Sequence, residues 1–166
     1  MPRTTRITRI VLAGCLTLLA ALAAAPNEAA AQDNPRNARF IFQLVEANGF
    51  EDTDPEIQDV VSELRELFRF DGYRLVDTAL LNTSTIGGGG HARMGGGDHG
   101  PFQIETWVER TDDPNLLRVA VGLHSDEDGT PMEATVNVRD EQTLVLGSTR
   151  TMSGAALILI MRLTIS

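Results

Sequence analysis

The sequence predicts an α+β fold in which one helix packs on a mainly antiparallel sheet of about seven strands. A single stretch, 53–70, has apolar residues at helical spacing, whereas most other segments alternate apolar and polar residues as half-buried strands do. The order of segments is strand, helix, strand at the start, followed by strands joined by short turns, which is typical of β-hairpins. Residues 32–166 are enough for one hydrophobic core, so we expect a single domain.

Residues 1–31 have the composition of a secretory signal peptide. Three arginines are followed by an apolar run of 16 residues and by Ala29-Ala30-Ala31, a small-residue cleavage site. We therefore expect cleavage after Ala31 and export to the periplasm or the extracellular space. The apolar run is short for an uncleaved anchor, so no integral membrane span is expected after cleavage. LAGC resembles a lipobox, but the apolar run continues beyond Cys15, which disfavours lipidation there.

The first three elements of the domain form a β-α-β start. Residues 38–46 and 73–81 are expected strands on either side of the helix. Thr53 or Asp54 can cap the helix, Pro55 fits its first turn, and Asp71-Gly72 ends it. The apolar stripe of this helix consists of Ile57, Val60, Val61, Leu64, Leu67 and Phe68.

The remaining strands follow a glycine-rich interruption. We expect them at 102–110, 116–124, 132–138, 143–148 and 155–165. The last of these is apolar on both faces, as in a central strand that is covered on both sides. On the first of them, Trp107 shares a face with Glu105 and Glu109, which makes this face a candidate partner surface.

The glycine-rich stretch 83–101 is predicted to be a flexible loop. A phosphate cradle would require a helix after the glycines and commonly a lysine, but Pro101 and a strand follow, and the chain contains no lysine. The alternative is a metal site, because His91, Asp98 and His99 lie in this stretch, with His124 as a further candidate. The loop is the preferred interpretation, since a bound ion would have to offset the large backbone entropy of the glycines.

Charge and motifs exclude several classes of function. The chain has 14 basic and 23 acidic residues, for a net charge of −9, which argues against partners such as nucleic acid or anionic membranes. Cys15 is the one cysteine, so no disulfide is expected. Because no G-x-S-x-G or H-E-x-x-H motif occurs, we expect neither an enzyme nor a bound cofactor.

The segment 136–165 carries one family resemblance. VNVRDEQTLVLGSTR followed by ALILIMRLTI resembles the closing part of the domain of bacterial secretins, with Asp140, Gln142, Thr143 and Gly147 at matching places. Glu141 stands where that family usually has glycine. The resemblance implies an export or envelope-assembly context and carries no catalytic residue.

Together these observations predict an exported, non-catalytic bacterial envelope protein. It would act by contact with another protein of the envelope, or by self-association, through a sheet edge or an exposed face. The alternative is a periplasmic module that binds a small ligand or a metal through the Gly/His stretch.

Overall fold

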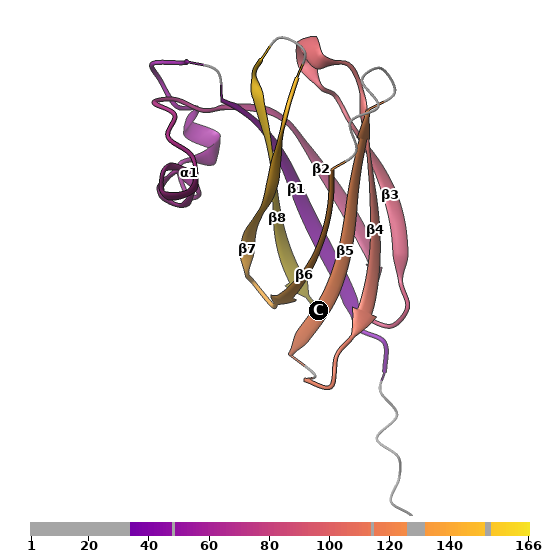
Figure 1. Cartoon of the computed structure of the whole chain (residues 1–166). Coiled ribbons are helices and arrows are strands. Elements are labelled where there is room, and N and C mark those ends of the chain that lie inside the picture. The colour runs from indigo at the N-terminus through magenta and orange to yellow at the C-terminus, as the bar shows by residue number, and fades with distance from the viewer. Residues whose placement is uncertain (1–33, 48, 114, 126–131, 152–153) are drawn as a thin grey trace, which may run out of the picture. The chain divides into compact units, whose positions relative to one another are not determined.

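The computed structural model describes residues 34–166 except 48, 114, 126–131 and 152–153, so the predicted signal peptide lies outside it. The described part is mostly antiparallel sheet with one α-helix, as the sequence predicts (Figure 1). None of its helices is long and apolar enough to cross a bilayer. The strands are β1 (Asn37–Ala47), β2 (Arg74–Ser84), β3 (Gly89–Met94), β4 (Phe102–Arg110), β5 (Leu116–Ser125), β6 (Met132–Arg139), β7 (Thr143–Arg150) and β8 (Ala156–Ile165).

The strands form two four-stranded sheets rather than the single sheet of about seven strands that was expected. One sheet has the order β2-β1-β8-β7, here called the β1 sheet, and the other has the order β3-β4-β5-β6, here called the β4 sheet. Every ladder is antiparallel. Contacts between β2 and β3 and between β6 and β7 join the two sheets, so successive strands follow a ring that β8 closes against β1. This is the connectivity of an up-and-down barrel, flattened into two layers.

The main core lies between the two sheets. Alternate residues of each strand point inward, as the period of two requires. Phe40 and Phe42 of β1 stack with ring centroids 6.0 Å apart, and both are fully buried. The facing sheet contributes buried residues such as Ile104 of β4 and Val119 of β5. This packed interior explains the alternating pattern that predicted the strands.

A second core, here called the outer cluster, lies on the outer side of the β1 sheet, beneath the helix. β8 supplies residues to both cores: Leu157 and Leu159 point between the sheets, whereas Ile158 and Ile160 point outward. Ile158 is paired with Val45 of β1, and both belong to the outer cluster. The prediction that this strand is apolar because it is covered on both faces is therefore confirmed.

The helical segment is shorter than the sequence pattern suggests. It consists of a 3-10 turn, η1 (Pro55–Ile57), and the helix α1 (Val61–Leu67). The Asp54 side chain caps η1 by accepting a hydrogen bond from the amide of Glu56 at 3.1 Å. Leu64 is fully buried, but Leu67 is 62% exposed, so the predicted apolar stripe was wrong at Leu67.

The helix ends early because the chain turns back toward the core at Phe68. Phe68 has an extended backbone, and its carbonyl oxygen accepts a hydrogen bond from the buried Tyr73 hydroxyl at 2.9 Å. Phe68 and Phe70 then pack against the outer cluster. Arg162 of β8 and Asp59 form an ion pair that also ties this segment to the sheet.

The loop expected at 83–101 instead contains β3, so the prediction of an unstructured stretch was wrong for Gly89–Met94. β3 pairs with β4 along its whole length. Its glycines allow close approach of neighbours: a Cβ on Gly89 would lie 2.6 Å from Cε3 of Trp107, and one on Gly90 would lie 2.7 Å from Cδ1 of Leu81. A 3-10 turn, η2 (Gly97–His99), follows before β4. Packing thus offsets the backbone entropy that argued for a loop.

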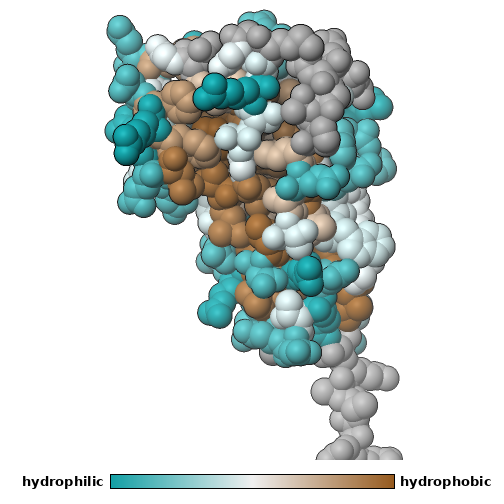
Figure 2. All heavy atoms as spheres, in the orientation of Figure 1, coloured by the Kyte–Doolittle hydropathy of each residue, from teal (hydrophilic) through white to brown (hydrophobic). Residues whose placement is uncertain are grey.

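The two boundaries between the sheets differ. At β2 and β3, the Asp77 carboxylate accepts a hydrogen bond from the amide of Gly95 at 2.5 Å, and the Thr83 hydroxyl donates to the carbonyl of Gly89 at 3.3 Å. At β6 and β7, partly buried apolar side chains reach the surface, and Figure 2 shows apolar residues gathered on this side. These side chains are Met132, Val136, Leu144 and Leu146.

Candidate functional site

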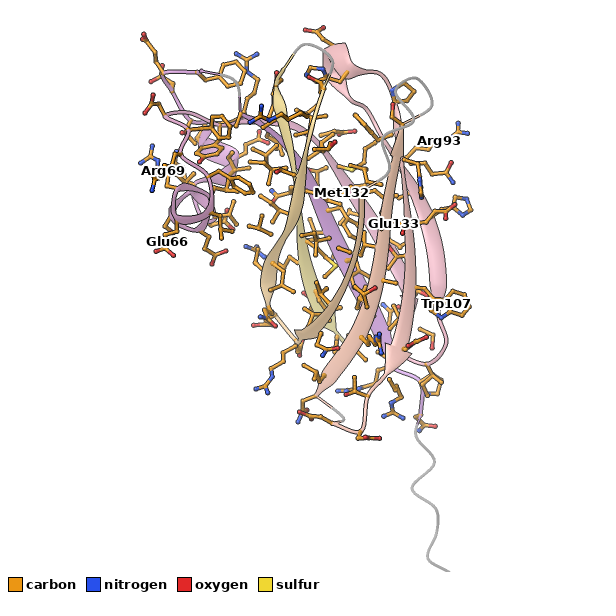
Figure 3. All side chains as sticks on the ribbon, in the orientation of Figure 1. Glu66, Arg69, Arg93, Trp107, Met132 and Glu133 are labelled. Atoms are coloured by element: carbon orange, nitrogen blue, oxygen red, sulfur yellow. The ribbon has the colours of Figure 1, made fainter. Side chains whose placement is uncertain are left out.

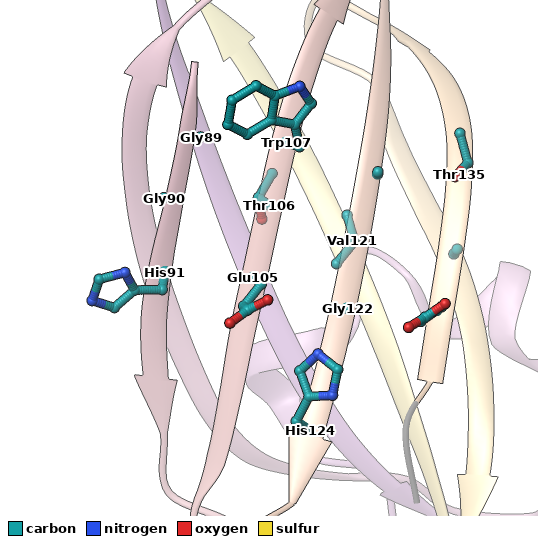
Figure 4. Close-up of a pocket in the computed structure, with 13 residues that line it drawn as sticks. Gly89, Gly90, His91, Glu105, Thr106, Trp107, Val121, Gly122, His124 and Thr135 are labelled. Carbon is teal, nitrogen blue, oxygen red and sulfur yellow. The ribbon is translucent and has the colours of Figure 1, made fainter. Parts of the chain in front are cut away.

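A shallow depression of about 600 Å³ lies on the outer face of the β4 sheet. All four strands of this sheet contribute to it, as Figure 4 shows. The side chains that matter for its chemistry come from β3, β4, β5 and β6: His91, Glu105, Trp107, His124, Glu133 and Thr135.

Two cross-strand rows build the depression. In one row, Gly89, Trp107, Ala120 and Thr135 lie side by side on successive strands. In the neighbouring row, the order is His91, Glu105, Gly122 and Glu133. Small residues thus occupy the β5 positions in both rows, which leaves room between larger side chains on β4 and β6. Over Gly122, the imidazole of His124 takes up part of this room.

Trp107 forms the aromatic part of the site. Its indole packs over β3 at Gly89, where any side chain would collide with the ring. Even so, 54% of the tryptophan remains exposed, and Figure 3 shows it projecting from the sheet. An exposed tryptophan held by its neighbours has the rigid, amphipathic surface that is typical of binding sites.

Two carboxylates flank the centre of the depression. Glu105 lies two residues before Trp107 on the same face of β4 and accepts a long hydrogen bond from Nε2 of Gln103, at 3.4 Å. Glu133 lies across Gly122 on β6. The imidazole of His124 leans over Gly122, with Nε2 2.8 Å from the position that a Cβ would take. Within the described residues, the lining contains two glutamates and two histidines but no arginine.

The three residues named as metal ligands lie in two different environments. His91 is exposed on β3 and lines the depression, next to Glu105 in the register. Asp98 and His99 belong to η2. Nε2 of His99 lies 3.2 Å from Oε1 of Glu46, and both side chains are largely buried. Across the residues that the structure describes, no group of three or more His, Cys, Asp or Glu side chains is placed to hold a metal ion.

Sequence reasoning found part of this site and missed the rest. It identified the face that carries Glu105 and Trp107, but it placed His91 in a loop and did not connect Glu133 with either. The missed signal was the alternation in 89–94, where Ala92 and Met94 point inward while His91 and Arg93 point outward. A hairpin between β5 and β6 was expected, but its register, which places Glu133 across Gly122 from Glu105, was not.

Comparison with known proteins yields no match: no protein-family model, no curated protein and no solved structure is similar to the chain.

Proposed function

We propose that this protein is an exported, non-catalytic binding module of the cell envelope that contacts another protein through the outer face of the β4 sheet. The observation that carries the proposal is Trp107, more than half exposed at the edge of a depression and held over Gly89. Tryptophan is enriched among the residues that dominate binding energy at protein interfaces. The signal-like residues 1–31 and the secretin resemblance of 136–165 support the envelope context.

The surroundings of Trp107 favour a protein over a small molecule. Small-molecule sites usually enclose most of the surface of their ligand. Here the depression is open, because it lies on the outer face of a sheet, and the interior between the sheets is filled by buried side chains such as Phe42 and Ile104. The β1 sheet offers less room for a partner, since α1 packs on its outer side.

A small-ligand module is the second candidate, and one observation favours it. His91 and His124 line the same depression as Glu105, so the depression offers imidazole and carboxylate groups to a polar ligand. Native mass spectrometry of the mature protein, purified from the cells that make it, separates the two. A retained small molecule would favour this candidate over the protein contact.

Site-specific photo-cross-linking tests the protein contact. A photoreactive residue replaces Thr135, on the proposed face, or Asn82, an exposed residue of β2 on the other sheet. We expect a covalent adduct of one size from position 135 in cells that produce the protein, and none from position 82. Adding Trp107→Ala should abolish the adduct. Failure to form it at 135, equal adducts at both positions, or insensitivity to Trp107→Ala would contradict the proposal.

A further inference from the structure

We infer that the partner offers a basic segment whose arginine or lysine stacks on Trp107 and pairs with Glu105. This inference rests on the proposed function and specifies the chemistry of the partner. It combines the exposed indole, the carboxylate beside it, and the absence of any arginine from the described lining of the depression.

The indole supplies the first part of the recognition. Cations bind over the faces of aromatic rings, and tryptophan is the strongest partner among the side chains. Gly89 lets the Trp107 ring pack across β3, which fixes one side of the ring and leaves more than half of the side chain accessible. A planar guanidinium from the partner can therefore stack on a surface whose position is already set.

The carboxylates supply the second part. Glu105 and Trp107 share a face of β4 two residues apart, a separation of roughly 7 Å along a strand. A guanidinium stacked on the indole can reach across this gap to the carboxylate. Glu133 lies two strands from Glu105, about 10 Å away. That spacing suits a second cationic side chain from the same segment.

Charge complementarity distinguishes Glu105 from other acids on this face. Glu109, also on β4, has Arg118 of β5 as its cross-strand neighbour, and both line the hollow on the other side of Trp107. Glu105 has no arginine opposite it: its cross-strand neighbours are His91 on β3 and Gly122 on β5, where the imidazole of His124 leans over the glycine. With no lysine in the chain and a net charge of −9, the molecule also attracts cationic segments over longer distances.

The fluorescence of Trp107 provides a direct test, because it is the one tryptophan of the chain. The probe is a short acetylated and amidated peptide with two arginines, and the control is the same peptide with both replaced by neutral citrulline. We expect a saturable change in Trp107 emission with the arginine peptide, weakened by added salt, and none with the citrulline peptide. Equal responses to the two peptides, or no saturable response, would overturn the inference.

Matched variants locate the charge that matters. Glu105→Gln should weaken binding of the arginine peptide by about tenfold or more, because it removes a charge-assisted contact. Glu109→Gln, on the same strand and face, should change the affinity by less than about threefold, since Arg118 lies opposite Glu109 and disfavours a second cation there. Equal effects of the two substitutions would show that the peptide responds to overall charge and not to this site.

The outcomes also separate this inference from the proposed function. If the arginine peptide fails to bind while position 135 still gives an adduct that depends on Trp107, the face binds a protein but not through a cation. If neither the peptide nor the adduct is observed, both proposals fail together.

Discussion

Replacing Leu64 with alanine tests whether α1 is held in place by burial. Leu64 is fully buried against the outer side of the β1 sheet. Leu67, three residues later on the same seven-residue helix, is 62% exposed. Both substitutions change leucine to alanine in one helix, so they carry a similar change in helix propensity. The difference between the two variants therefore reports burial.

The expected magnitudes follow from these exposures. Removing three carbons from a fully buried leucine costs about 2.4 kcal/mol in transfer free energy, at about 0.8 kcal/mol for each CH₂ group. The cavity left at Leu64 raises the loss to about 3–5 kcal/mol. Leu67 is less than half buried, and its loss leaves no enclosed cavity, so we expect about 1 kcal/mol or less.

Urea unfolding measures both losses. Circular dichroism reports the sheets and Trp107 fluorescence reports the outer face of the β4 sheet, so coincident transitions would establish two-state behaviour. We expect the midpoint to fall much further for Leu64→Ala than for Leu67→Ala, with an unchanged denaturant slope. Equal losses would refute the assignment of the buried face, and no loss in either variant would show that α1 adds nothing to stability.

Three further predictions concern single side chains. Thr106→Val should raise the free energy of unfolding by about 1 kcal/mol in a urea melt, because the buried Thr106 hydroxyl has no hydrogen-bond partner in the described structure. Glu141→Gly should stabilise by about 0.5 kcal/mol in the same assay. Relief of the positive φ of 59° there gains about 1–2 kcal/mol, and the flexibility of glycine costs about 0.5–1 kcal/mol. Burial raises the pKa of Tyr73 above its ordinary value of 10.0, so only the unfolded chain ionises readily there. The contribution of Tyr73 to the free energy of unfolding should therefore be fully present below pH 10 and should decrease as the pH rises above 10. Tyr73→Phe should remove this fall, and a stability profile that is identical in both proteins would contradict the assignment.

The sequence predicted most strands because their faces differ in burial. Alternating residues in 102–110 and 116–124 gave both the elements and their inward faces, and β4 and β5 have nearly these bounds. The double-sided apolar pattern of 155–165 also identified a covered central strand. These patterns are local, and they follow directly from the period of two along a strand.

The features that the sequence did not show depend on contacts between residues in different strands, which are separated along the chain. Gly89 and Gly90 were predicted to be in a loop because the side chains that lie against them, Trp107 and Leu81, belong to other strands. The division into two sheets is likewise set by which strands pair, and β1 pairs with β8 at the far end of the chain. For the same reason, the candidate site could be anticipated on β4 alone, and Glu133 joins it only through the register of β5 and β6.

The pairing of β1 with β8 has a consequence for how the molecule folds. Ladder partners such as Phe40 and Leu163 are separated by almost the whole described chain, and this ladder forms the centre of the β1 sheet. Closing so long a loop costs chain entropy before its contacts form, and proteins rich in such distant contacts fold slowly. The hairpins from β3 to β6 need only neighbouring segments and can form first. The two sheets should therefore acquire protection from hydrogen exchange at different times during refolding, the β4 sheet before the β1 sheet.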